Sequence, residues 1–221
     1  MSSRVVVILA CLGLTVSPAL GTAQRGDILV LDDEQHRIQT NPLEPFLKAN
    51  PDMRPEPKIV SSSLWRRYIA TWAIDEGRLF LIDVSALRQT PGVADFETEL
   101  HSVMAALFPE QQRVFAEWFT GHIVVVRGDL VEYVHLDYAS TFDDYSVLTV
   151  REGVVTDDRR MGVKQFRRFR KRQFRAYQQT DQYRSSFDKF KDPDETTKEV
   201  EDFIFRVSAG RYMTILFDDA P

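Results

Sequence analysis

Apolar residues fall into short runs separated by short polar turns along much of the chain, and this pattern predicts β-hairpins. Three such pairs of runs occupy residues 27–39, 68–84 and 145–156. Both strands of the middle pair are apolar on both faces, which is typical of strands covered on two sides, so we place Trp72 and Phe80 in the core. The pattern therefore favours a sheet built mainly from antiparallel neighbours.

A fourth hairpin is predicted over residues 119–138, where two β-branched runs flank a Gly-Asp pair. If this pair forms a two-residue turn, His122 lies directly opposite His135 on the neighbouring strand. Asp137 follows His135 by two positions and therefore shares its face. The hairpin thus predicts a cluster of two imidazoles and one carboxylate.

His122, His135 and Asp137 suit a zinc site, because zinc takes three or four ligands of these types. On this interpretation the protein is a metal-dependent hydrolase, with Asp83 or Glu132 as a helper. The alternative is that both histidines bond to neighbouring side chains or to the backbone on a half-exposed sheet face. The pairing depends on the turn, since one more turn residue would move His122 to another partner or face.

The predicted helices lie mostly late in the chain. Apolar spacing with early acidic residues favours helices at 95–107 and 109–119, and a third helix is expected from Asp194 to about Ser208, followed by a strand over 212–217. Because hairpins come first and βαβ units are not evident, we expect an α+β fold with a mainly antiparallel sheet.

The most charged stretch, Val163 to Gln179, predicts an amphipathic helix. At 100° per residue, one arc is aromatic and the opposite side is cationic. The aromatic arc contains Phe166, Phe169, Phe174 and Tyr177, and the cationic side contains Lys164, Arg167, Arg168, Lys171, Arg172 and Arg175.

We assign a partner-binding role to Arg167, Arg168, Lys171, Arg172 and Arg175, whose charge suits an acidic protein surface, phosphate or anionic lipid. The alternative is an ordinary surface helix whose charge is balanced by acidic residues further along the chain, such as those at 192–202.

Charge and cysteine content narrow the possible functions. The chain has 33 acidic and 28 basic residues, and a formal charge of −5 argues against a nucleic-acid-binding protein. Its one cysteine, Cys11, lies in the apolar N-terminal run, so the rest of the chain offers neither a disulfide nor a thiol nucleophile.

Residues 1–23 have the pattern of a secretory signal peptide: Arg4, then an apolar run over 5–16, then small residues near Gly21. The run is too short to cross a bilayer, so we expect removal of the leader, no transmembrane segment afterwards, and a periplasmic or secreted protein. Cys11 leaves a lipoprotein as the alternative. Residues 24–221 are expected to form a single globular domain.

Several segments resemble a family of uncharacterised bacterial proteins: Asn-Pro-Leu-Glu at 41–44, the Leu-Trp-Arg-Arg-Tyr-Ile-Ala-Thr-Trp run at 64–72, and Val-Phe-Ala-Glu-Trp-Phe-Thr-Gly at 114–121. Members of that family tend to have glycine at the position of Arg67 in this chain. The resemblance implies a bacterial source and a single compact domain, and it carries no known activity.

The sequence contains no G-x-S-x-G, H-E-x-x-H, glycine-rich phosphate loop or EF-hand pattern. We therefore expect an exported, non-enzymatic protein-binding module of the inhibitor or immunity type, without a resident cofactor. The alternative function is the metal-dependent hydrolase, with zinc held by the residues named above.

Overall fold

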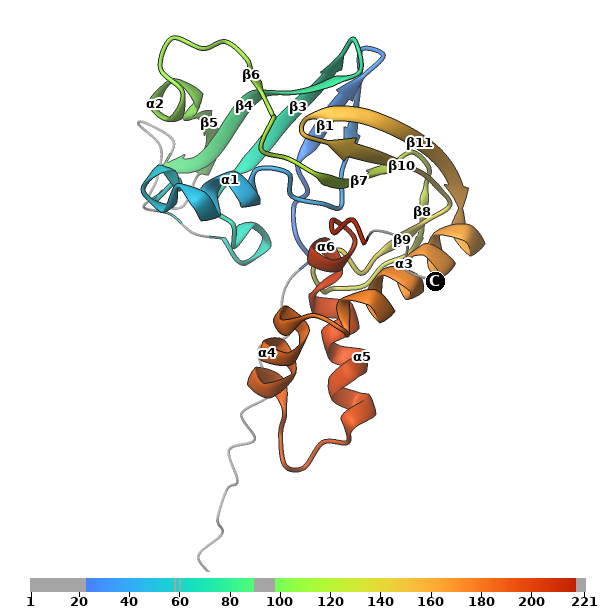
Figure 1. The fold of residues 1–221 in the computed structure, drawn as a ribbon. Helices are drawn as coiled ribbons and strands as arrows, with labels where there is room; N and C mark the ends of the chain where they lie inside the picture. The colour runs from blue at the N-terminus through green and yellow to red at the C-terminus, as the bar shows by residue number, and fades with distance from the viewer. Residues whose placement is uncertain (1–22, 58, 60, 90–97, 218–221) are drawn as a thin grey trace, which may run out of the picture.

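The structure is a computed structural model that describes residues 23–57, 59, 61–89 and 98–217 (Figure 1). One large sheet, mainly antiparallel, is combined with helices, most of which follow it in the chain, so the prediction of an α+β fold is confirmed. The predicted signal peptide lies outside the described residues, apart from Ala23.

The main path of the sheet has the strand order β2-β1-β3-β4-β11-β10-β7. All neighbouring pairs on this path are antiparallel except β1 and β3, and the three predicted hairpins are confirmed as β1–β2, β3–β4 and β10–β11. The strands are β1 (Ile28–Leu31), β2 (Glu34–Arg37), β3 (Ile69–Asp75), β4 (Arg78–Gln89), β7 (Gly121–Val126), β10 (Asp144–Arg151) and β11 (Val154–Gly162), with β5 (Thr98–Ser102) and β6 (Val114–Phe115) added beside β4.

The sheet curves until its two ends meet. Just beyond β2, Ile38 pairs with Val125 of β7, and the backbone N–H of Gln39 donates to the Val124 carbonyl at 2.8 Å. On the other side, β11 pairs with β4 only through Val154, and the Val155 N–H donates to the Gly77 carbonyl in the β3–β4 turn at 2.8 Å. Within the described residues, the rest of β11 pairs with β10 alone. The result is a half-closed barrel with one open edge.

Apolar side chains fill the inside of this curved sheet. The core includes Trp72 as predicted, whereas Phe80 is only partly buried on the other face. The buried members come from most strands and from the connecting segments, and they include Leu29, Ile38, Leu79, Leu81, Val84, Phe119, Ile123, Val125, Leu148 and Val150.

A second core lies between β7, β10 and the C-terminal helices (Figure 1). Alternation along β10 sends Tyr145 and Val147 toward the helices, while Leu148 and Val150 enter the first core. The Tyr145 ring stacks on Phe166 with 3.6 Å between centroids. The helices are α3 (Val163–Tyr177), α4 (Asp181–Phe190), α5 (Thr197–Val207) and α6 (Ala209–Tyr212), and α4 and α5 form an arm that extends away from the sheet.

Two of the predicted helices are wrong. Residues 98–102 form β5 and pair with β4, so only Met104–Leu107 is helical (α2) in the described part of 95–107; residues 90–97 lie outside it. The 109–119 segment contains β6 and turns instead of a helix. Both segments lie beside β4, and pairing with its edge outweighs their helical apolar spacing.

The predicted strand at 212–217 is also wrong, because α6 continues through Tyr212 and the following residues are irregular. Gly210 lies inside α6, where the Tyr138 ring would stand 2.6 Å from an added Cβ atom. The helix expected over 194–208 is confirmed as α5, with a capping box formed by Thr196 and Glu199. The sequence reading missed α4.

The remaining short elements are α1 (Glu44–Ala49), the 3-10 turns Pro51–Met53 and Ser62–Leu64, and a separate two-stranded sheet of β8 (Leu130–Glu132) and β9 (Thr141–Phe142). None of the helices in the described residues has both the length and the apolar character needed to cross a bilayer.

Candidate functional site

The predicted hairpin over 119–138 does not form. β7 pairs with β10, which places His122 opposite Thr149, and β8 pairs with β9 instead of β7. The predicted pairing of His122 with His135 is therefore wrong. The physical reason is burial: on β10, Val147 and Tyr145 join the core beside β7, whereas Val131 and Tyr133 on the expected partner strand are exposed.

The three residues of the predicted metal site have separate surroundings. His122 packs edge-on against Phe169 of α3 at 5.5 Å between centroids. His135 is exposed and bonds to the Tyr133 hydroxyl at 2.8 Å, while Asp137 accepts a hydrogen bond from the Gly210 N–H of α6 at 3.2 Å. Within the described residues, no group of three or more His, Cys, Asp or Glu side chains is placed to hold a metal ion. The geometry on which the hydrolase alternative depended is not formed.

Burial shifts the protonation of two of these groups in opposite directions. Desolvation, with Arg159 and Arg172 adding to it, lowers the pKa of His122 to about 4. Desolvation also raises the pKa of Asp137 to about 6, although backbone N–H donors work against it. Both shifts follow from packing against the C-terminal helices.

The helpers proposed for the hydrolase are engaged elsewhere. Asp83 accepts hydrogen bonds from the hydroxyls of Ser85 at 2.6 Å and Ser102 at 2.5 Å. Glu132 lies 3.5 Å from Arg167 of α3. Within the described residues, neither carboxylate bonds to one of the predicted histidine ligands.

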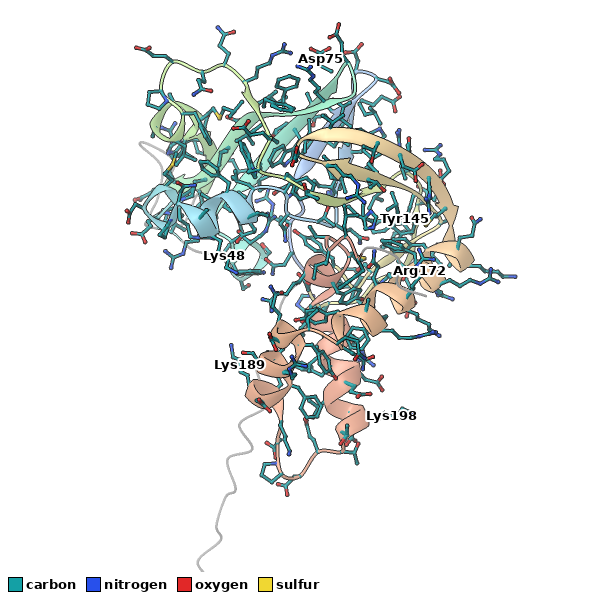
Figure 2. The ribbon with its side chains drawn as sticks, viewed as in Figure 1. Lys48, Asp75, Tyr145, Arg172, Lys189 and Lys198 are labelled. Atoms are coloured by element: carbon teal, nitrogen blue, oxygen red, sulfur yellow. The ribbon has the colours of Figure 1, made fainter. Side chains whose placement is uncertain are left out.

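The predicted amphipathic helix is confirmed as α3. Its four aromatic residues are buried, and the five cations assigned to partner binding are all exposed. Arg172 projects from this helix in Figure 2, which also shows Lys189 and Lys198 on the separate arm of α4 and α5. The helix therefore presents a cationic side to solvent, as its spacing predicted.

The structure divides these cations into two groups. Arg167 and Lys171 line a groove, whereas Arg168, Arg172 and Arg175 do not. Helical geometry explains the division, since Arg168 and Arg172 lie about 60–100° further around the helix than Lys171. We call the first pair the groove cations and the other three the outer cations.

The groove lies between α3, α5 and the β8–β9 sheet and has a volume of about 500 Å³. Its lining contains four cationic and two acidic side chains, so it carries an excess of two formal positive charges. The lining residues are Glu132, Val134, Ala139, Thr141, Arg167, Arg170, Lys171, Asp202, Phe205 and Arg206.

Arg170 is the feature of this groove that the sequence reading missed. It is 6% exposed and lies within the buried face of α3. Its Nε and Nη2 atoms donate to the Tyr212 hydroxyl at 3.2 and 3.1 Å, and Nη1 donates to the Ala139 carbonyl at 3.4 Å. Its position in the sequence was the available signal. At 100° per residue, Arg170 falls inside the aromatic arc, which faces the core, and a cation is rarely buried there without a specific partner.

A different buried arginine belongs to the core. Arg66 is 1% exposed and donates to the Asp27 carboxylate at 2.8 Å and to the Arg25 carbonyl at 2.9 Å. Asp27 also accepts from the Ala70 N–H at 3.1 Å and from the Trp72 indole at 3.3 Å. This network joins the N-terminal segment to β3 and has a structural role.

The chain matches no protein-family model, no curated protein sequence and no solved structure.

Proposed function

We propose that this is an exported binding protein that holds an acidic segment of another protein on the cationic side of α3, as an inhibitor or immunity-type partner would. Periplasmic or secreted location follows from the leader pattern at residues 1–23. The protein acts by occupying its partner and needs no chemistry of its own.

The observation that carries the proposal is the lack of counter-charges around α3. The chain has more acidic than basic residues, yet in the described residues only Arg167 of the six exposed α3 cations has a carboxylate within ion-pair distance. That pair is itself open to solvent, with Arg167 54% and Glu132 58% exposed, so it contributes little to stability. The remaining cations are free to meet acids from outside.

Exposed apolar residues beside the groove favour a protein segment over a nucleic acid or a simple ion. Leu130, Val131 and Tyr133 are 52%, 54% and 61% exposed, and they alternate with or adjoin two groove residues, Glu132 and Val134. Aromatic and apolar residues next to arginines are typical of protein-binding surfaces. The groove cations would contact the segment, and the outer cations would attract it over a longer range.

The test is binding of a fluorescein-labelled glutamate heptapeptide to the mature protein, followed by fluorescence anisotropy. Arg167→Glu combined with Lys171→Glu should weaken binding by about tenfold or more, because two direct contacts become repulsive. The matched control, Arg168→Glu combined with Arg172→Glu, makes the same charge change outside the groove and should have a smaller effect.

A glutamine heptapeptide is the control ligand, and binding of the glutamate peptide should weaken as salt is raised. Equal affinity for the two peptides, or no binding of either by wild type, would contradict the proposed function. Equal losses in the two double variants would move the contact from the groove to the whole cationic side.

A further inference from the structure

Arg170 carries a buried charge that no carboxylate balances within the described residues. Its hydrogen-bond partners are a hydroxyl and a backbone carbonyl, and its guanidinium lies 4.9 Å from the centre of the Phe205 ring. A buried cation without a counter-charge is unfavourable, because desolvation is not offset by Coulomb attraction. An arginine in this position at the wall of a groove is available to an anion that enters it.

The guanidinium still has hydrogen-bonding capacity. It has five N–H groups, and three of them serve Tyr212 and Ala139. One N–H remains on each terminal nitrogen, and two neighbouring donors match the two oxygens of a carboxylate. Tyr212 holds the side chain in place, since its hydroxyl also donates to the Phe205 carbonyl at 3.1 Å.

The other residues that line the groove indicate which chemical groups should lie next to that carboxylate in the ligand. Arg206 and the two groove cations supply further positive charge, while Glu132 and Asp202 limit the excess to two, which suits a ligand group of low negative charge. Val134, Ala139 and Phe205 supply an apolar wall. The pocket therefore fits a carboxylate with an apolar neighbour.

We propose that Arg170 is the anchor of the groove and binds a carboxylate of an acidic peptide segment whose adjacent residue is apolar. This inference rests on the proposed function, and it adds the ligand group, a carboxylate, and the residue that binds it, Arg170. The groove cations and Arg206 add electrostatic attraction, and Arg170 supplies the paired hydrogen bonds.

The probe is a fluorescein-labelled, C-terminally amidated hexapeptide of alternating glutamate and leucine, with a glutamine–leucine peptide as control. Arg170→Gln should weaken binding of the glutamate peptide by about tenfold or more, because it removes charge-assisted hydrogen bonds to the carboxylate. Arg170→Lys should weaken it less, because the positive charge remains. The control Lys189→Gln removes an exposed positive charge on α4, outside both the groove and the cationic side of α3, and should change the affinity by less than about threefold.

A second measurement uses the wild-type protein, so the result does not depend on folding of a variant. The 15N-detected Nε–H resonance of Arg170, identified by its absence in Arg170→Lys, should shift when the glutamate peptide is added and stay in place with the glutamine peptide. A peptide with a free C-terminus tests whether the terminal carboxylate serves as well as a side chain.

The outcomes separate the two proposals. If Arg170→Gln binds like wild type and the Arg170 resonance does not move, while the Arg167→Glu, Lys171→Glu variant still loses binding, the anchor is wrong and the proposed function stands. If wild type does not distinguish glutamate from glutamine peptides, both are wrong. Binding of a phosphoserine peptide but not of the glutamate peptide would overturn the carboxylate assignment.

Discussion

Two arginines in this protein are buried in similar environments, but only one of them is paired with a carboxylate. Arg66 is 1% exposed and Arg170 is 6% exposed, and each guanidinium lies over an aromatic ring, at 5.0 Å from Tyr68 and 4.9 Å from Phe205. Arg66 faces the buried carboxylate of Asp27, whereas the contacts of Arg170 in the described residues are uncharged. Burial and aromatic contact are thus common to both, and only the counter-charge separates a core residue from a recognition residue.

The largest expected effect tests the Arg66 side of this comparison. Asp27→Asn should lower the free energy of unfolding by about 3–5 kcal/mol, because it leaves a buried guanidinium without its counter-charge. Urea unfolding at pH 7 measures the loss. Asp75→Asn is the matched control, since it breaks an exposed pair with Arg113 and should cost less than about 1 kcal/mol. Similar losses in both variants would remove the distinction between internal and exposed pairs.

The next largest effect concerns His122, whose pKa depends in part on the positive charge of α3. Its pKa is lowered to about 4, first by desolvation and then by Arg159 and Arg172. A histidine whose folded pKa lies below its unfolded value of about 6.5 stabilises the protein fully above pH 6.5, and this contribution is lost as the pH falls toward 4.

Between pH 7 and pH 4 the wild type should therefore lose about 2–3 kcal/mol more unfolding free energy than His122→Gln. Arg172→Gln should raise the His122 pKa measured by NMR titration, because it removes a nearby positive charge. If the wild type and His122→Gln respond equally to pH, the histidine is not buried beside an unbalanced charge.

A smaller effect is expected on the Arg170 side. Arg170→Met removes an unbalanced charge together with hydrogen bonds to neutral groups, and these changes oppose each other, so the unfolding free energy should change by less than about 1.5 kcal/mol. Tyr212 keeps its own bond to the Phe205 carbonyl. Urea unfolding decides, and a loss as large as that of Asp27→Asn would assign Arg170 to the core and not to the groove.

The smallest expected effect concerns the backbone conformation of Arg67, the residue that follows Arg66. Arg67 has a φ of 72°, a left-handed conformation that glycine adopts more easily, and it turns the chain into β3 directly after Arg66. Arg67→Gly should stabilise the protein by about 0.5 kcal/mol, whereas Arg67→Ala should give no gain because alanine keeps the Cβ atom. Thermal unfolding compares the two, and equal melting temperatures would contradict the explanation.

The sequence predicts the parts of this fold that depend on local signals. The turns of β3–β4 and β10–β11 each contain a Glu-Gly pair with positive φ at both residues, 48° and 71° at Glu76-Gly77 and 48° and 77° at Glu152-Gly153. Such turns bring adjacent strands together with a fixed register. The helix α3 is equally local, because its periodicity alone defines both faces.

The partner of β7 could not be predicted in this way, because β10 is distant in sequence and wins through burial of Tyr145 and Val147. The same distinction applies to the residues predicted for the candidate site. His122 and His135 depended on a pairing that did not form, while the cations of α3 followed from spacing. Arg170 is one of seven basic residues on α3, and it differs from the other six in its bonds to Tyr212 and Ala139. Because these partners are distant in sequence, its role could not be predicted from the sequence of the helix alone.

The open edge of β11 is a place where a strand of a second copy of this chain could add to the sheet. From Thr156 to Met161 the described strand has no neighbouring strand on one side, so its backbone groups there could pair with a strand from another molecule. Two aspartates and two arginines, at positions 157–160, occupy this strand, and Arg159 is held to Asp157 at 2.5 Å. An incoming identical strand would have to desolvate these charges, so the same element that leaves the barrel unsealed also discourages edge-to-edge growth.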